Sequence, residues 1–422
     1  MDAPRYLTAD EAARELGVKR ETLYAYVSRG LVRSEPGPGG RRARRYHAED
    51  VRALLARKQR GRSPRAAVEG ALDWGTPVLE SGLTLITERA LYYRGRDVVR
   101  LAAERTLEEV ALLLWTGSDP ASGPARVARA GSDARPAGIV GTPGTRTGQA
   151  LATVARLAGL EPAHRMMAAL PLLAAADPAA ARIASERVVA TGLALLPALA
   201  AAAAGVDHAP AAHAVRVLAA AWAPGVAGAE RLLEAAAILC ADHELNTSTL
   251  AARCAASTWA SPYGVVAAGL ATLHGTRHGG ASGRARAMLV EAGGLPDPAG
   301  VVRARLGRGE DVPGFGHPLY PDGDPRASSL LGWLREAREG RSPALDVADA
   351  VAREAERVLG LRPNVDFALA ALAHALALPQ GAELALFALG RTTGWIAHAL
   401  EQYPRAQIRP RARYAGPPPE PS

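Results

Sequence analysis

The sequence predicts a mainly α-helical protein in which a small basic domain precedes a larger helical body. Three observations support this fold class. The chain has 422 residues, which is too long for one ordinary core. Helical periodicity dominates from about residue 148 to 402, where strand patterns are sparse. Residues 1–62 carry a net charge of +7 out of +8 for the whole chain, so we expect only this segment to meet a polyanion.

The first segment reads YLTADEAARELGVKRETLYAYVSRGLV, the pattern of helix, glycine turn and helix. Thr8 and Glu11 form a capping box that starts the first helix, and Gly17 makes the turn. A second helix is predicted to begin near Lys19. The spacing directs the apolar residues Ala12, Ala13, Leu16, Leu23 and Val27 inward and leaves Arg20, Tyr24 and Ser28 outward.

A hairpin wing is predicted next, after a turn at Pro36–Gly40, and a closing helix from Ala48 to Arg57. Residues 5–57 therefore resemble the winged helix-turn-helix domain of the MerR and excisionase type. The resemblance implies a DNA-binding surface made by Arg20, Tyr24 and the wing arginines Arg41, Arg42, Arg44 and Arg45. A solvated basic face and a protein–protein module are the alternatives.

The domain boundaries follow from composition. We predict a helix-turn-helix domain at 1–62, a linker at 63–68 and the body from residue 69. Short strands are expected after Trp74, then a helix capped by Thr106 and Glu109 and ended by Gly117. Residues 118–147 are rich in glycine, proline, serine and arginine and predict a long surface excursion.

The N-terminus, one apolar run and the two cysteines favour an intracellular protein. The N-terminus lacks the apolar core of a signal peptide. The uncharged run Val188–Val206 is mostly alanine and contains Gly192 and Pro197, so we expect a buried, kinked helix. Cys240 and Cys254 are the two cysteines of the chain, and no disulfide is expected between them. The protein is predicted to be cytoplasmic.

Five residues of the body stand next to helix-breaking or polar neighbours and are candidates for chemistry: His243, His274, His278, His317 and Asp366. The segment PGFGHPLYPDGDPR places His317 on a loop, since its prolines and glycines forbid helix and sheet. No metal-binding spacing such as HExxH occurs, so no metal site and no cofactor are predicted. Each residue alone is as well explained by packing, capping or ion pairing.

Six motifs in order carry a resemblance: ADHELN, LHGTRHGGA, GFGH with GDPRA, PNVDF, LFALGRTTGWIAHALEQ and IRPRARY. Residues 69–416 resemble the citrate synthase family. The resemblance implies a helical fold of two domains, a large one at 69–273 and 380–416 and a small one at 274–379 that closes over the substrates. It also implies the reaction of the tricarboxylic acid cycle in which an acyl-CoA condenses with oxaloacetate, the acyl group becoming alkyl on transfer.

The resemblance assigns roles to individual residues. Asp366 is implied as the base that removes a proton from the thioester, His278 as the neutral imidazole that stabilises the enolate, and His317 as the group that polarises the oxaloacetate carbonyl. Gly279 and Gly280 would allow a close backbone approach, and Phe367 would pack against the substrates. The implied oxaloacetate-binding residues are His243, Arg326, Arg391 and Arg409, with Arg409 reaching in from the partner of a homodimer. We expect His274 to be structural.

One loop departs from the family pattern. Pro318, Pro321 and Asp322 stand where family members commonly have basic residues that meet CoA phosphates. Arg277, Arg284 or Arg286 would then compensate. The sequence thus supports two functions: a homodimeric synthase of citrate or 2-methylcitrate, and a DNA-binding transcriptional regulator whose body senses an oxoacid or acyl-CoA.

Overall fold

The computed structural model describes residues 6–28, 32–36, 44–52, 54, 79–118, 144–157, 159–209, 213–338, 342–410 and 416. The chain forms two compact units, residues 1–80 and 81–422. Each unit is described by itself below. The predicted linker at 63–68 and most of the predicted excursion at 118–147 lie outside the described residues.

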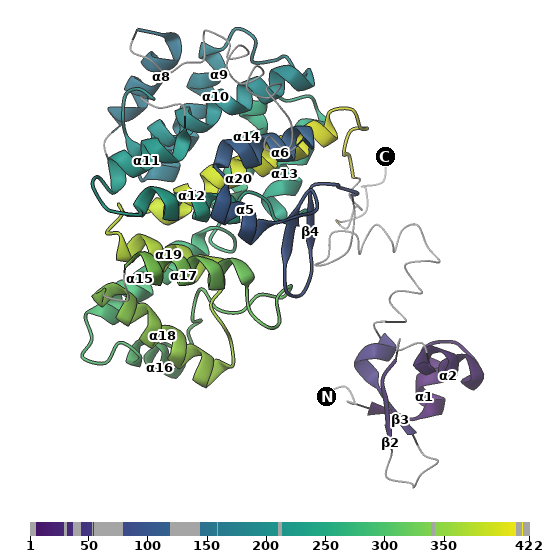
Figure 1. The fold of residues 1–422 in the computed structure, drawn as a ribbon. Helices are drawn as coiled ribbons and strands as arrows, with labels where there is room; N and C mark the ends of the chain where they lie inside the picture. Colours follow the sequence, from purple (N-terminus) through teal and green to yellow (C-terminus); the bar gives the residue numbers. More distant parts are fainter. Residues whose placement is uncertain are drawn as a thin grey trace. The chain divides into compact units, whose positions relative to one another are not determined.

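The N-terminal unit combines two short helices with a three-stranded antiparallel sheet (Figure 1). The sheet order is β1-β3-β2, with Glu35 opposite Arg45 across the hairpin. Residues 48–52 and 54 are helical. The elements are β1 (Tyr6–Leu7), α1 (Ala9–Glu15), α2 (Arg20–Ser28), β2 (Ser34–Pro36) and β3 (Arg44–His47).

Most local predictions for this unit are confirmed. The hydroxyl of Thr8 accepts from the Glu11 backbone N–H, and the Glu11 side chain returns the bond, as in a capping box. Gly17 has φ +60°, which a glycine adopts without strain. A small core forms from Leu7, Ala12, Ala13, Leu16, Leu23, Val32, Tyr46, Ala48, Val51 and Leu54. The hairpin and the helical residues after it agree with a wing and a closing helix.

The body begins with a small antiparallel sheet of β4 (Thr84–Ile86), β5 (Leu91–Tyr93) and β6 (Arg96–Asp97), as predicted. Helix α5 (Val98–Glu104) follows and is an element that the sequence reasoning missed. Helix α6 (Leu107–Thr116) has the predicted capping box of Thr106 and Glu109, and it ends at Gly117 with φ +72°. The Tyr93 hydroxyl contacts the backbone of residue 242, so the sheet is anchored to the helical core.

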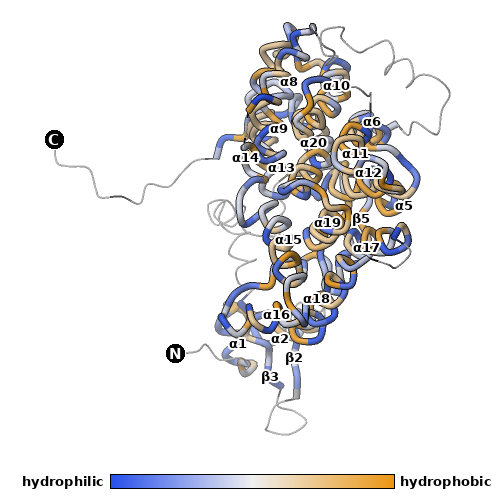
Figure 2. Tube along the Cα trace, turned by 90° about the vertical axis from the view of Figure 1, so that its left-hand side faces the viewer, coloured by the Kyte–Doolittle hydropathy of each residue, from blue (hydrophilic) through white to orange (hydrophobic). Residues whose placement is uncertain are grey.

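Helices build nearly all of the remaining body. Figure 2 shows the apolar character of α10, α19 and α20, which fill the core. Between α6 and the motif LHGTRHGGA the helices are α8 (Arg146–Ala155), α9 (Pro162–Ala176), α10 (Ser185–Ala204), α11 (Ala214–Trp222), α12 (Ala229–Leu239), α13 (Thr247–Ser257) and α14 (Pro262–Leu273).

Helix α10 contains the run that resembles a membrane span in length and apolar composition, and 83% of its apolar window is buried inside the protein. Pro197 lies within the helix, and Gly205 ends it with φ +72°. Packing against α9, α11 and α20 accounts for the apolar composition. Both cysteines are free thiols, as predicted.

Five helices form a second group that Figure 1 shows on one side of the body. α15 and α18 pack on α19, while α16 packs on α18 and α17 on α19. Their bounds are α15 (Gly280–Gly293), α16 (Gly300–Gly307), α17 (Pro325–Ala337), α18 (Pro343–Leu359) and α19 (Val365–Ala375). The division into a large and a small domain at residues 274 and 379 stays a prediction, because the compact unit spans all of 81–422.

Helix α20 (Ala382–Gln402) returns through the centre of the body and contacts α6, α10, α12, α13 and α14. Two glycines one turn apart let other backbone approach it closely. A Cβ at Gly390 would lie 2.1 Å from the Ala237 carbonyl oxygen, and one at Gly394 would lie 2.3 Å from the Ala241 carbonyl oxygen. The end of α12 and the loop after it are therefore seated directly on α20.

Candidate active site

The loop that carries His317 is shaped by three glycines. Gly314, Gly316 and Gly323 have φ of +89°, +71° and +110°, values that favour glycine. The loop is tied to the start of α19, since the Asn364 side-chain amide donates to the Gly316 carbonyl oxygen at 3.0 Å. The prediction that this segment forms neither helix nor sheet is confirmed for residues 313–324 apart from one bridge between Phe315 and Pro363, and it is wrong for Pro325 and Arg326, which begin α17 because Asp324 caps that helix.

A buried ion pair closes this loop. Asp324 caps α17, and its carboxylate accepts from Nε and Nη2 of Arg326 at 2.9 and 2.8 Å. The same carboxylate accepts from the Val365 backbone N–H at 3.0 Å, which joins α17 to α19. Both side chains are almost fully buried, so the pair holds a positive guanidinium in a fixed orientation inside the protein.

The rings of His243, His317 and Tyr320 lie close to one another. Nε2 of His243 lies 3.0 Å from the Tyr320 hydroxyl, and the ring centroids of His243 and His317 are 5.2 Å apart. The Leu319 backbone N–H donates to Nδ1 of His317 at 3.1 Å. That nitrogen is therefore unprotonated, and the proton of the neutral imidazole sits on Nε2. Burial, followed by the charge of Arg326, lowers the pKa of His317 to about 4, so the ring is neutral at pH 7.

His278 lies in the turn before α15, and its Nε2 is 3.0 Å from the Ser248 hydroxyl of α13. The Ser248 hydroxyl donates its single proton to Asn246 Oδ1 at 2.8 Å, so in this arrangement its oxygen accepts from His278 Nε2. Burial lowers the pKa of His278 to about 4, with a further contribution from Arg391. The neighbouring Gly279 is required, because a Cβ there would lie 2.8 Å from the Leu273 carbonyl oxygen.

Asp366 sits in the first turn of α19, which Asn364 caps by accepting from the backbone N–H groups of Asp366 and Phe367. Asp366 is thus not the cap itself, and its side chain is available for another role. Oδ1 of Asp366 is inaccessible to water and has no hydrogen-bond partner among the described residues. Burial raises the pKa of this carboxyl to about 7.

Arg391 on α20 is 1% exposed and donates from Nε to the Cys240 carbonyl oxygen at 2.8 Å. Its Nη1 is buried with no partner among the described residues. The charge of Arg391 acts on the pKa of His243, His278 and Asp366, as that of Arg326 does on His243, His317 and Asp366. These interactions place the candidates in one electrostatic environment.

The remaining candidates differ in their exposure and contacts. Arg409 is exposed in the segment after α20. His274, expected to be structural, stacks on His164 with ring centroids 4.4 Å apart. Arg286 is engaged by Glu383 at 3.0 Å and by two carbonyl oxygens, whereas Arg277 and Arg284 are exposed. Phe367 is buried and tilts against Phe315 at 4.8 Å.

Sequence reasoning missed three residues that shape the site: Tyr320, Asp324 and Ser248. A signal existed for Asp324, because an aspartate directly before proline is a frequent start of a helix. Tyr320 lies in the quoted loop and is 1% exposed, yet nothing in the local pattern predicts its contact with His243. His243 lies in the loop between α12 and α13, not in a helix.

The candidate DNA-binding residues lie in the N-terminal unit. Tyr24 is 50% exposed, in agreement with its predicted outward direction. Arg20 pairs with Asp10, Arg44 donates to the Ser34 carbonyl oxygen at 3.4 Å, and Arg45 pairs with Glu35 at 3.3 Å. Arg41 and Arg42 lie outside the described residues.

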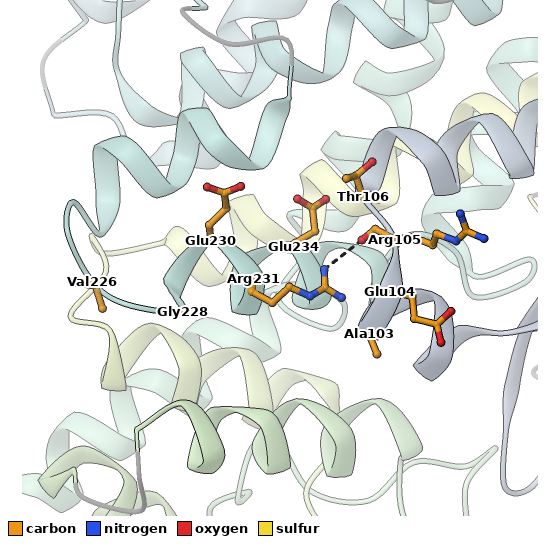
Figure 3. A pocket seen from close by; sticks show the side chains of 9 residues that line it. All are labelled: Ala103, Glu104, Arg105, Thr106, Val226, Gly228, Glu230, Arg231 and Glu234. Carbon is orange, nitrogen blue, oxygen red and sulfur yellow. Dashed lines mark hydrogen bonds between the residues drawn. The ribbon is translucent and has the colours of Figure 1, made fainter. Parts of the chain in front are cut away.

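A surface pocket of about 430 Å³ lies apart from these candidates, between the α5–α6 turn and α12. Figure 3 shows Arg231 reaching across it to the Arg105 carbonyl oxygen at 3.1 Å. Glu234 lines the pocket, and burial raises its pKa to about 7. None of the predicted site residues lines it. Across the described ranges, no group of three or more histidine, cysteine or acidic residues could hold a metal ion.

Comparison with known proteins gives two family matches. The family described as "Citrate synthase, C-terminal domain" matches residues 71–411, and "Helix-turn-helix domain" matches residues 6–59. Citrate synthase 2 of Bacillus subtilis is 39% identical over 189 residues, which are 43% of this chain and 50% of that protein. A 2-methylcitrate synthase of Mycobacterium tuberculosis is 35% identical over 190 residues, 43% of this chain and 47% of that protein.

The chain spans about half the length of these curated relatives. Among solved structures, citrate synthase from Thermotoga maritima has a TM-score of 0.65 and 28% sequence identity, and the match covers 81% of this chain and 94% of that one.

Proposed function

Because the chain belongs to the citrate synthase family, we propose that it condenses acetyl-CoA or propionyl-CoA with oxaloacetate to give citrate or 2-methylcitrate and CoA. The observation that carries the proposal is the inaccessible Oδ1 of the half-buried Asp366, which has no partner among the described residues. Unsatisfied buried oxygens are rare and costly, so one in this position is best explained by a substrate. The neighbouring neutral imidazoles supply the complementary donors.

The first half of the reaction removes a proton from the carbon next to the thioester carbonyl. Asp366 accepts it, and its pKa of about 7 makes it a stronger base than an ordinary carboxylate. The enolate oxygen formed at the same moment is stabilised by His278. If the Ser248 hydroxyl turns its proton toward Nε2, the neutral ring carries its own proton on Nδ1 and can donate it to that oxygen.

The second half joins the enol carbon to the oxaloacetate carbonyl. Water then attacks the carbonyl carbon of the thioester so formed, which breaks its C–S bond, leaves the product carboxylate and releases CoA as the free thiol. His317 has its proton on Nε2 and donates it to the carbonyl oxygen, which becomes the product hydroxyl. Arg326 and Arg391 bind the two carboxylates, because guanidinium groups match carboxylate geometry and both are already fixed by the protein. His243 completes this oxaloacetate site.

The active form is proposed to be a homodimer in which Arg409 reaches the partner's oxaloacetate site. Its exposure in the single chain is consistent with that role. Arg277 and Arg284 remain for the CoA phosphates, because Arg286 is committed to Glu383. Arg284 also acts on Asp366, whose pKa its charge lowers after the larger effect of burial.

The test is thiol release by the purified full chain with oxaloacetate and either acyl-CoA. We expect free CoA thiol and, by mass spectrometry, citrate or 2-methylcitrate. A reaction without oxaloacetate controls for simple thioester hydrolysis. Absence of thiol release across acetyl-, propionyl- and butyryl-CoA would overturn the proposal.

The second candidate function is transcriptional regulation, which the helix-turn-helix match at residues 6–59 favours. Here the body would bind the same metabolites and the N-terminal unit would bind DNA. A gel shift with the DNA upstream of its own gene tests this: binding should vanish when Arg41, Arg42, Arg44 and Arg45 become alanine. Arg14→Ala, on the exposed side of α1, is the control that should still bind. No shift at low salt would discard this function.

A further inference from the structure

A chain of buried polar side chains runs beneath the loop between α12 and α13, and none of its members takes part in the proposed reaction. Nη1 of Arg253 contacts Glu401 Oε2 at 3.0 Å and His398 Nδ1 at 3.1 Å. Nε2 of His398 lies 3.3 Å from Asp242 Oδ1. Thr84 donates its hydroxyl to Asp242 Oδ2 at 2.5 Å. Arg253, His398 and Asp242 have no exposed surface.

The protons of this chain can be assigned from the donors. A guanidinium only donates, so Nδ1 of His398 accepts from Arg253 and the neutral ring carries its proton on Nε2. Nε2 faces Asp242 Oδ1 across the 3.3 Å ion-pair contact, and neither atom makes a hydrogen bond among the described residues. Burial opposes ionisation of Asp242, yet His398 and Arg391 keep the pKa of its carboxyl below the usual value. Asp242 is therefore a buried, charged carboxylate.

Contacts to its backbone and to its side chain hold Asp242 in place. The Tyr93 hydroxyl accepts from its backbone N–H at 3.0 Å and lies 3.0 Å from its carbonyl oxygen. Gly394 of α20 donates to the Ala241 carbonyl oxygen at 3.1 Å. The next two residues are His243 of the oxaloacetate site and Glu244, which has φ +52°, a value rarely adopted by residues other than glycine. This strained conformation persists only where its surroundings enforce it.

The same segment also anchors Arg391. The Cys240 carbonyl oxygen accepts from Arg391 Nε, two residues before Asp242. Burial lowers the pKa of Arg391, and the charge of Asp242 acts in the opposite direction. Asp242 thus influences both oxaloacetate-binding groups, His243 through the backbone and Arg391 through its charge.

We propose that Asp242 and His398 are positioning residues of the oxaloacetate site. His398 holds the Asp242 carboxylate in one orientation, and Asp242 fixes the strained 240–244 segment and balances the Arg391 charge until the substrate carboxylates arrive. The inference rests on the proposed function only in naming oxaloacetate as the occupant. It assigns the network to oxaloacetate binding and not to removal of the thioester proton.

The experiment measures oxaloacetate binding by isothermal titration calorimetry on the full chain, which needs no turnover. Asp242→Asn keeps the shape and removes the charge, and we expect its Kd to rise at least about tenfold, since an unpaired buried partner remains. His398→Gln keeps one donor for Asp242 and should raise Kd less than His398→Leu. In thiol-release assays the KM for oxaloacetate should rise while the KM for acyl-CoA stays unchanged.

Asp177→Asn is the matched control. Asp177 is also buried and paired, with Arg187 at 2.6 Å, but it joins α9 and α10 outside the site. It should lower Tm without changing the oxaloacetate Kd. Thr84→Val, which removes a single hydrogen bond to Asp242, serves as a milder variant if Asp242→Asn does not fold, and a severalfold rise in Kd is expected.

The outcomes separate the two claims. If Asp242→Asn or His398→Leu folds and its Kd for oxaloacetate stays within twofold of the wild-type value, the inference is overturned. If neither variant folds, an unchanged oxaloacetate Kd in Thr84→Val overturns it. An equal rise of both KM values would also overturn it, because it would indicate a general structural role. Wild type that binds oxaloacetate but releases no thiol would refute the proposed function, while the Kd comparison still decides the inference. Wild type that does not bind oxaloacetate would overturn both.

Discussion

The arginines of the two compact units are held in opposite ways. In the body, Arg326 and Arg391 are 2% and 1% exposed and fixed by Asp324 and by a backbone carbonyl. In the N-terminal unit, the side chain of Arg20 is 52% exposed and pairs with an equally exposed Asp10. A buried charge must be paired or await a ligand, whereas a surface ion pair contributes about 0–1 kcal/mol. The comparison teaches that the body holds these arginines fixed in its interior, while the N-terminal unit keeps the charge of Arg20 in water.

Replacing Asp366, the proposed base, gives the largest expected effect. Asp366→Asn keeps the shape of the side chain but cannot accept the proton, so thiol release should fall by at least about a hundredfold. The assay is the initial rate with saturating oxaloacetate and acyl-CoA. Asp346→Asn, an exposed aspartate on α18, should retain the wild-type rate. An Asp366→Asn protein that releases thiol at the wild-type rate would contradict the role of Asp366 as the base.

Arg391→Met tests whether Arg391 contributes more to oxaloacetate binding than to the stability of the fold. Losing a charge-assisted contact to a substrate carboxylate costs about 2 kcal/mol or more, so the oxaloacetate Kd should rise at least about thirtyfold. Methionine fills much of the same volume, and Tm should stay unchanged or rise because a desolvated charge is gone. Arg165→Met on α9 is the control for binding. A lower Tm with unchanged Kd would show that Arg391 is structural.

The pH dependence of stability sharpens the same contrast. Burial raises the pKa of Asp366 from 3.8 to about 7, so the folded state holds a proton that the unfolded chain releases. The contribution of Asp366 to stability therefore falls as pH rises between about 4 and 7. Asp366→Asn abolishes this loss, and its Tm should exceed that of wild type by more at pH 8 than at pH 5. Equal differences at both pH values, measured by circular dichroism, would contradict the burial of this group.

The smallest effect is expected in the N-terminal unit. Arg20→Ala removes the pair with Asp10, and because both side chains are exposed the free energy of unfolding of this unit should change by less than about 1 kcal/mol. Thiol release should be unaffected. Chemical denaturation followed by circular dichroism measures the first quantity. A loss above 2 kcal/mol would show that Arg20 supports the fold itself.

Local sequence patterns predicted the elements whose causes are local. The capping boxes at Thr8 and Thr106 and the stop at Gly117 are confirmed because each depends on residues within one turn. The same reasoning missed α5, which starts directly after a two-residue strand. Helix α15 begins at Gly280 although glycine is a weak helix former, because packing of α15 against α19 stabilises the helix.

The sequence named the candidate site residues but not the residues that contact and support them. His317 stands in a loop whose composition indicates function, and Arg326 follows that loop in the first turn of α17. Tyr320 and Ser248 acquire their meaning only from residues 77 and 30 positions away in the sequence, His243 and His278. Contacts at such separations are set by tertiary packing, which no local pattern of residue types encodes. The roles of the predicted residues remain predictions that the experiments above decide.

The seating of α12 on Gly390 and Gly394 limits how this protein can be engineered. Replacing helical glycines by alanine is a common route to thermostability, since it reduces the freedom of the unfolded chain. Here the added methyl group would collide with the Ala237 or Ala241 carbonyl oxygen and displace the wall that carries His243. A consensus design or mutant library that treats these two positions as ordinary helix sites would therefore shift the segment that carries His243 and bring no gain in heat tolerance.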